Sequence, residues 1–241
     1  VLEATVDRVV DVWDAEDLEV SIDAGLFAHL YLHPLPATLG AAPSREHVKL
    51  LRPLNFDGRT SDMVQTWMSA LGSQRPAVYV TYGTEVAPTA PWRAILGALG
   101  GLDVDAVVTT GPNLHPDSLG STPPNVRVEQ FVPQSFLFDR VTVMCSHAGA
   151  GSSFGAAARG IPQLCVPLGA DQWDNADALS AAGVAITLED DQRDMDTIRS
   201  AFERLLTEPS FKMNAADLAD QFQRLPHPDE HVPAIAALTV A

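Results

Sequence analysis

The chain of 241 residues is 46% hydrophobic, so it can bury one sizeable core but is short for two full domains. Its 15 Lys and Arg residues against 31 Asp and Glu residues give a formal net charge of −16, which repels nucleic acid and anionic membranes and excludes both as partners. No apolar stretch approaches membrane-spanning length and the first residues do not resemble a signal peptide, so we expect a cytoplasmic protein without a membrane span.

The first 56 residues carry isolated elements rather than a regular pattern. Apolar residues recur at helical spacing up to Trp13, and residues 18–25, 27–34 and 48–56 have the character of strands. Two or three strands and one helix cannot make an independent domain of ordinary size. We therefore expect residues 1–56 to be the remnant of a domain that is mostly absent.

Residues 57–75 have the character of a linker. A polar turn at 57–62 is followed by apolar residues at helical spacing between Met63 and Leu71, and Gly72 and Pro76 then break the pattern. The sequence therefore predicts a linker that contains one short helix.

From residue 76 onward, strands alternate regularly with helices. Short apolar runs predict strands at 77–82, 105–110, 126–131, 141–145, 163–167 and 183–188. Apolar residues at helical spacing predict helices at 91–100, 154–160, from about 173, and at 195–209, 210–225 and 231–241. Such alternation is typical of a parallel sheet covered on both faces. The predicted fold class is α/β, a Rossmann-like parallel sheet with helices on both faces over residues 76–241, together with the amino-terminal remnant.

A glycine-rich turn (residues 146–153) follows the predicted strand 141–145 and precedes a helix of small residues. This order places backbone N–H groups and the positive end of a helix at the mouth of the sheet, where a phosphate group can bind. The alternative is that Gly149 and Gly151 only permit tight packing and that His147 is a capped or core histidine.

Two neighbouring segments favour the phosphate interpretation. Asp171, Gln172 and Asn175 follow the next strand, and residues 131–134 close the strand before. With the glycine-rich turn, these segments all lie at the carboxyl edge of the predicted sheet. Together they offer a planar pocket, a phosphate cradle and a pair of side chains that can bind hydroxyl groups. A nucleotide sugar has these three parts in that order.

The motifs FVPQ, HxGxGS, GIPQLCVP and DQWDNA resemble the donor-binding signature of the GT-B glycosyltransferases, in particular the bacterial enzymes that transfer sugars to antibiotics and other natural products. The resemblance covers residues 76–225. It implies a TDP- or UDP-sugar donor, a small-molecule acceptor, inversion at the anomeric carbon and no bound metal or cofactor. It also implies that the general base lies in the missing amino-terminal domain, so no catalytic residue is expected in this chain.

The resemblance also assigns donor-binding roles. The backbone of Val132 and the side chain of Gln134 would bind the base, and Asp171 with Gln172 would bind sugar hydroxyls. The diphosphate would be bound by Thr84, His147, Gly149, Gly151, Ser152 and Ser153. For Thr84 the alternative is an ordinary strand-ending turn, and for Asp171 it is a cap of the following helix.

Two positions depart from the family pattern. Gly155 stands where many relatives have a glutamate that binds the ribose hydroxyls, which favours TDP over UDP because the deoxyribose of TDP lacks the 2′-hydroxyl. Ala148 stands where bacterial relatives often have glycine, and it is small enough to keep the turn.

Two other functions stay open at this point: a sugar-nucleotide epimerase of the same fold, and a non-catalytic module that binds a nucleotide sugar or activates a partner. The chain is expected either to form a homodimer or to act with the missing amino-terminal half.

The cysteines and the carboxyl-terminal histidines do not suggest a further site. Cys145 and Cys165 lie in predicted buried strands without metal-ligand spacing, so we expect two reduced thiols. His227 and His231 flank a proline-rich break with no cysteine or carboxylate cluster, so we expect solvated histidines and no metal.

Overall fold

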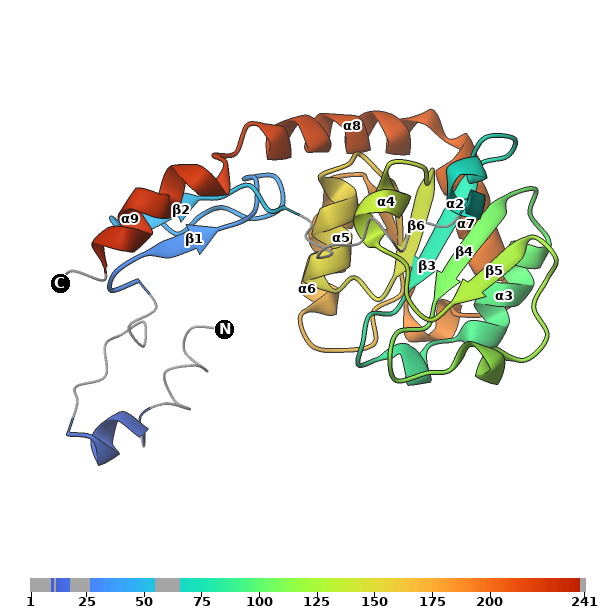
Figure 1. Ribbon diagram of the computed structural model, residues 1–241, viewed down its shortest axis with the longest axis horizontal. Helices are drawn as coiled ribbons and strands as arrows, with labels where there is room; N and C mark the ends of the chain where they lie inside the picture. The colour runs from blue at the N-terminus through green and yellow to red at the C-terminus, as the bar shows by residue number, and fades with distance from the viewer. Residues whose placement is uncertain (1–9, 11, 18–26, 55–65, 239–241) are drawn as a thin grey trace. The chain divides into compact units, whose positions relative to one another are not determined.

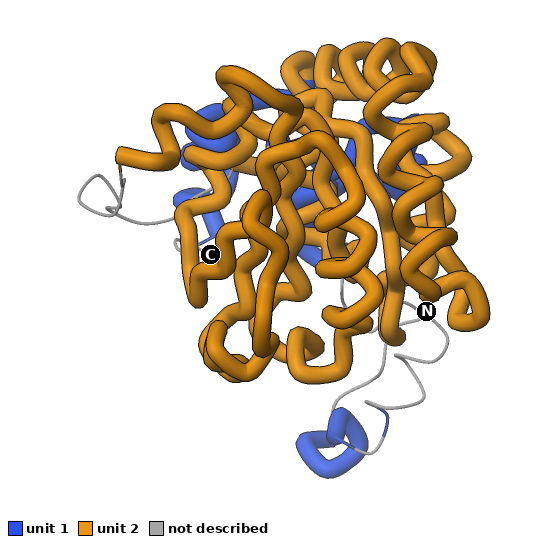
Figure 2. The backbone as a smooth tube through the Cα atoms, turned by 90° about the vertical axis from the view of Figure 1, so that its right-hand side faces the viewer, with its two compact units in different colours: residues 1–52, 225–241 blue, residues 53–224 orange. Residues whose placement is uncertain are grey.

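The computed structural model describes residues 10, 12–17, 27–54 and 66–238. The chain separates into two compact units, which Figure 2 shows in different colours. One comprises residues 53–224, and the other comprises residues 1–52 together with 225–241.

The larger unit is built on a six-stranded parallel sheet (Figure 1). Its strands are β3 (Ala77–Thr81), β4 (Asp105–Thr109), β5 (Val126–Glu129), β6 (Val143–Ser146), β7 (Gln163–Cys165) and β8 (Ala185–Thr187). The central strands are buried on both faces, which explains their continuous apolar sequence.

Helices cover both faces of this sheet, and each face has its own apolar core. The helices α3 (Trp92–Gly100) and α7 (Met195–Thr207) contribute to the core on one face. The other core includes residues of α2 (Thr66–Ala70), α4 (Gln134–Phe138) and α5 (Ala150–Ala157). The predicted α/β fold with a doubly covered parallel sheet is confirmed.

The order of the strands is β5-β4-β3-β6-β7-β8. Starting from β3, the chain adds β4 and β5 on one side and then returns to place β6 on the other side. A doubly wound sheet binds ligands at such a reversal, outside the carboxyl ends of the two central strands. The loop after β3 and the glycine-rich turn after β6 both lie at this reversal.

The remaining helices of the larger unit are α6 (Gln172–Ala181) and α8 (Pro209–Gln223), and its 3-10 turns are η2 (Ala87–Thr89), η3 (Pro116–Leu119) and η4 (Asp190–Gln192). The smaller unit has the parallel pair β1 (Tyr31–His33) and β2 (Val48–Leu50), with η5 (Pro228–His231) and α9 (Val232–Ala237).

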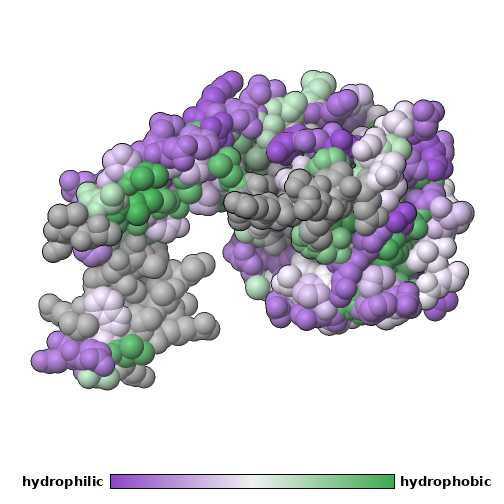
Figure 3. All heavy atoms as spheres, in the orientation of Figure 1, coloured by the Kyte–Doolittle hydropathy of each residue, from purple (hydrophilic) through white to green (hydrophobic). Residues whose placement is uncertain are grey.

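A backbone hydrogen bond from Arg52 N–H to the Pro226 carbonyl, 2.8 Å long, joins the two segments of the smaller unit. Apolar side chains gather over α9, where Val232, Ile235 and Leu238 are exposed (Figure 3). The expected donor-binding domain of residues 76–241 thus includes a carboxyl-terminal stretch that the contacts assign to the smaller unit.

Several predictions from the sequence differ from the structure, and others concern residues that the structure does not describe. The helix α4 was not predicted, because five residues after a proline show too little periodicity. The helix α5 begins at Ala150 rather than near Phe154. Its first turn contains glycine and serine, which show no apolar periodicity and therefore did not indicate a helix. His231 is buried rather than solvated. The predicted strand 18–25, the turn 57–62 and most of the first helix lie outside the described residues.

Candidate nucleotide-sugar site

The glycine-rich turn crosses from the end of β6 into α5 at the carboxyl edge of the sheet. Ala148 takes a positive φ of 62°, and its N–H donates to Ser146 Oγ at 3.1 Å. Gly149 is the N-cap of α5, and the Ser153 N–H donates to the Gly149 carbonyl at 3.0 Å. The N–H groups before Ser153 are the unpaired donors of the helix start, so they can bind an anion.

His147 lies between this turn and the loop after β3. Its ring stacks on Tyr82, with centroids 6.0 Å apart and planes inclined by 27°. An ideal Cβ on Gly149 would lie 2.3 Å from His147 Nε2, and one on Gly83 would lie 3.1 Å from His147 Cε1. Glycine at both positions therefore leaves the space that the imidazole occupies.

The surroundings of His147 determine its charge. Burial lowers its pKa from the ordinary value of 6.5, while the Asp171 carboxylate and the Thr81 backbone carbonyl oppose this by favouring the protonated ring. Its Nδ1 is buried and has no partner of good hydrogen-bond geometry among the described residues. The free ring is therefore predominantly neutral near neutral pH and can gain a proton when an anion binds.

Asp171 lies near the same turn, and Asn175 connects the two. The Asn175 Nδ2 donates to the Ala148 carbonyl at 3.0 Å and to Asp171 Oδ2 at 3.1 Å. Asp171 occupies the N-cap position of α6, but its side chain makes no capping hydrogen bond. Its exposed carboxylate keeps acceptor capacity for a hydroxyl group.

One of the two polar atoms of the Gln172 amide is occupied by backbone hydrogen bonds. The side chain is buried, and Oε1 accepts the N–H groups of Leu168 at 2.7 Å and Gly169 at 3.1 Å. The carbonyl oxygen of this amide therefore shapes the loop after β7. Only Nε2 is left to meet a sugar hydroxyl.

Gln134 connects the loop after β5 to the start of α5. Its Nε2 donates to Ser152 Oγ at 2.9 Å and lies 3.2 Å from Tyr79 Oη. Val132 beside it is buried in the core under α4. Hence the predicted base-binding loop and the predicted phosphate turn are in direct contact.

The predicted diphosphate residues are not equivalent. Gly151 is exposed, and an ideal Cβ there would meet no atom within 4 Å. Ser153 is fully buried, and its Oγ lies 3.4 Å from Ser146 Oγ at the end of β6. Thr84 is exposed in the loop after β3, and its carbonyl accepts from Asn113 Nδ2 at 2.8 Å.

Two further residues organise the site: Tyr82, which the sequence did not identify, and Asn175, which the sequence placed at the carboxyl edge without a binding role. Tyr82 is a buried strand-end residue whose contact with His147 depends on two strands being neighbours. Asn175 follows Asp171 by four residues, and this helical spacing was the signal that could have placed both on one face of α6.

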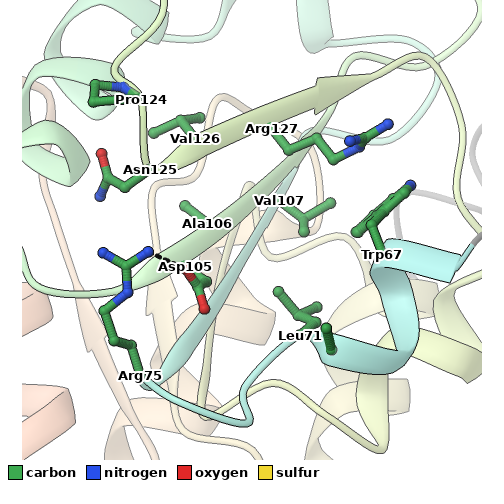
Figure 4. Close-up of a pocket in the computed structure, with 11 residues that line it drawn as sticks. Trp67, Leu71, Arg75, Asp105, Ala106, Val107, Pro124, Asn125, Val126 and Arg127 are labelled. Carbon is green, nitrogen blue, oxygen red and sulfur yellow. Dashed lines mark hydrogen bonds and ion pairs between the residues drawn. The ribbon is translucent and has the colours of Figure 1, made fainter.

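A separate cavity of about 420 Å³ lies against α2 and the amino ends of β4 and β5, away from the carboxyl edge (Figure 4). The Arg127 guanidinium lies 4.4 Å above the Trp67 ring and pairs with Glu129, and Arg75 pairs with Asp105. Both lining cations are therefore already paired, so this cavity is a poor site for an anionic donor.

No group of His, Cys, Asp and Glu side chains among the described residues is arranged to hold a metal ion. Within the same residues, no helix is both long enough and apolar enough to cross a membrane.

Comparison with known proteins identifies related sequences. L-demethylnoviosyl transferase of Streptomyces niveus is 32% identical over 179 residues, which cover 72% of this chain and 47% of that protein. 4'-demethylrebeccamycin synthase of Lentzea aerocolonigenes is 32% identical over 212 residues, which cover 83% of this chain and 49% of that protein. The chain therefore spans about half the length of the curated relatives it matches.

Solved structures give the same result for the fold. Spinosyn rhamnosyltransferase SpnG complexed with thymidine diphosphate matches with a TM-score of 0.77 and 28% identity, over 86% of this chain and 56% of that one. The same enzyme complexed with spinosyn aglycone matches with a TM-score of 0.76 at 28% identity, over the same shares of the two chains. The resemblance to natural-product glycosyltransferases is confirmed.

A family model described as Erythromycin biosynthesis protein CIII-like, C-terminal domain, matches residues 93–238. This match spans more than half of the chain and contains the glycine-rich turn, His147 and Asp171. The chain therefore belongs to the family of EryCIII-like C-terminal domains.

Proposed function

We propose that this chain is the donor-binding portion of an inverting glycosyltransferase that moves a sugar from a TDP- or UDP-sugar to a small natural-product acceptor. The observation that carries the proposal is the position of His147, held at the reversal of the sheet beside the start of α5 and linked through Ala148 and Asn175 to Asp171. The glycosyltransferases that the chain matches support it.

The chain's own residues would stabilise the leaving group. Transfer of the sugar breaks its bond to the diphosphate, and negative charge builds up on the departing nucleotide. Protonated His147 and the N–H groups at the start of α5 would neutralise that charge without a metal ion. Asp171 would accept hydrogen bonds from sugar hydroxyls and orient the ring.

We propose TDP as the preferred nucleotide. Gly155 is buried within α5, so nothing at that position can bind a ribose 2′-hydroxyl. A glutamate there would provide a charge-assisted hydrogen bond of about 1.5–3 kcal/mol to that hydroxyl. The matched SpnG structure that contains thymidine diphosphate supports this preference.

The general base that deprotonates the acceptor, and the acceptor site itself, are proposed to lie in an amino-terminal half. We infer that the chain acts either with such a half or as a homodimer. A cytoplasmic location is also part of the proposal, supported by two buried cysteines that are free thiols. The matched relatives do not favour the epimerase or the non-catalytic module.

Isothermal titration of the chain with TDP, UDP and GDP tests the proposal. We expect TDP to bind at least as tightly as UDP, GDP to bind more weakly, and no sugar transfer by the chain alone. Binding of no pyrimidine nucleotide by a folded chain would refute the proposed function. A strong preference for UDP would refute only the inference from Gly155, and efficient transfer by this chain would refute the placement of the base.

A further inference from the structure

A buried glutamine lies beneath the glycine-rich turn. Gln163 begins β7 and pairs with Met144 on β6 and with Ala185 on β8, so it lies inside the sheet. It is fully buried, as are its strand neighbours Leu164 and Cys165. Burial of an amide costs free energy unless its polar atoms are all paired.

The side chain of Gln163 is only partly paired. Its Nε2 donates to the Ser153 carbonyl at 2.9 Å, whereas Oε1 is buried without a hydrogen-bond partner among the described residues. An apolar side chain of similar length would avoid that cost. Stability of the sheet alone therefore does not explain a glutamine at this position.

The carbonyl that Gln163 binds belongs to the first turn of α5. The Ser153 hydroxyl lies 3.4 Å from Ser146 Oγ, and Ser146 Oγ accepts the Ala148 N–H at 3.1 Å. One buried polar cluster thus connects β7, α5 and the turn. Ala148 has a φ of 62°, which a residue other than glycine keeps only where its surroundings enforce it.

We infer that Gln163 is a positioning residue for diphosphate binding. Its amide holds the first turn of α5 against β7, so the N–H groups of that turn and His147 converge on one place. Gln163 acts through Ser153 and does not touch the ligand. The inference rests on the proposed function and adds to it a residue outside the donor-binding set.

The test compares Gln163→Met, which keeps the length of the side chain but cannot hydrogen-bond, with the unaltered chain. We expect TDP to bind about tenfold more weakly by calorimetry, because small displacements of preorganised donors are costly. The thermal midpoint should stay equal or rise, because a half-paired amide is removed. The amide NMR signals of Gly149 and Gly151 should shift.

Leu164→Val is the matched control, because Leu164 neighbours Gln163 on β7 but packs in the core on the other face of the sheet. It should lower the thermal midpoint and leave TDP affinity unchanged. Gln163→Leu also removes the amide that donates to the Ser153 carbonyl and should weaken TDP binding as Gln163→Met does. This second variant decides the matter if Gln163→Met fails to fold.

Two results would count against the inference in different ways. Unaltered affinity and unshifted turn amides in Gln163→Met, or in Gln163→Leu where Gln163→Met does not fold, would overturn the role of Gln163 while the proposed function stands. Absence of TDP binding by the unaltered chain would overturn the proposed function, and the role of Gln163 with it.

Discussion

The imidazole of His147 is restricted by its neighbours to a narrow space. Tyr82 stacks against one face, and the Cα atoms of Gly83 and Gly149 approach its edge so closely that a methyl group would crowd it. A ligand-binding side chain that is restricted in this way loses little conformational freedom when the ligand binds. The chemistry of the site therefore depends on glycines as much as on the histidine.

His147 should couple TDP binding to proton uptake. Burial lowers the pKa of the free ring, whereas the negative charge of a bound diphosphate would favour the protonated ring. We expect affinity to rise as the pH falls from about 8 and to level off below the lowered pKa. His147→Ala should cost about 1.5–3 kcal/mol of binding and abolish the pH dependence. Calorimetry in buffers of different ionisation enthalpy measures the protons taken up.

The lowered pKa of His147 also makes the stability of the ligand-free chain depend on pH. Lowering the pH should strengthen TDP binding but destabilise the fold. Because the folded pKa lies below the ordinary 6.5, the unfolded chain binds the proton first as the pH falls. The contribution of His147 to the free energy of unfolding is therefore present above 6.5 and is lost as the pH falls toward the lowered value. A His147→Gln variant with an unchanged stability profile below 6.5 would contradict this assignment.

Gly149→Ala should weaken TDP binding through His147. The new Cβ would lie 2.3 Å from Nε2, so the ring must turn away from the diphosphate. We expect a loss of about tenfold or more in affinity, because the donor is misplaced by a large fraction of an ångström. In a His147→Ala background the same substitution should have little effect. Equal losses in both backgrounds, measured by calorimetry, would show that Gly149 acts independently of the ring.

At the scale of the elements, side chains hold the segments that are proposed to bind the donor. Gln134 after β5 binds Ser152 of α5, Asn175 of α6 binds the carbonyl of Ala148, and Gln172 binds the backbone that follows β7. The loops at this edge of the sheet therefore support one another. Such cross-links preorganise a site that sits on short connections.

The start of α7 offers a test of helix capping away from the site. Asp194 Oδ1 accepts the N–H groups of Asp196 and Thr197, each at 3.0 Å, and the Thr197 hydroxyl bond lowers its pKa most. Asp194→Ala should lower the thermal midpoint by about 2–4 °C at neutral pH. Asp191→Ala, an exposed carboxylate in η4, is the control and should have no such effect.

The pH dependence of the cap gives a second check. The folded pKa of Asp194 is depressed, so its contribution is present above the unfolded pKa and is lost as the pH falls through the folded value. The difference between Asp194→Ala and the unaltered chain should therefore disappear in acid. Calorimetric melting at several pH values measures it, and a constant difference would point to a packing effect.

At the scale of the whole molecule, the charge of −16 opposes an anionic ligand. Under the proposed function, local N–H groups and His147 would bind the diphosphate against this repulsive field. The association rate of TDP should therefore rise as salt is raised from about 0.01 to 0.15 M, because screening weakens the repulsion. Stopped-flow measurement with uncharged thymidine as the control tests this. A rate that falls with salt would indicate a local cationic field that outweighs the net charge.

Local patterns in the sequence were enough to predict the strands, the main helices and the family. Continuous β-branched runs between turns predict buried parallel strands, and the glycine-rich turn after one of them indicates the carboxyl edge of the sheet. Both signals depend only on residues that are neighbours in the sequence. The ten predicted donor-binding residues lie in the four segments that follow β3, β5, β6 and β7, five of them within the starts of α4, α5 and α6, and their binding roles stay predictions.

Only the tertiary structure decided which polar atoms are already paired. The ring of Tyr82 against His147, the Gln134 amide on Ser152 and the Gln163 amide on Ser153 each join segments far apart in the sequence. Such contacts depend on which strands are neighbours, and periodicity does not encode that order. The same reason explains why residue type alone does not indicate that the Ser153 hydroxyl lies near Ser146 or that the Gln172 carbonyl accepts backbone N–H groups.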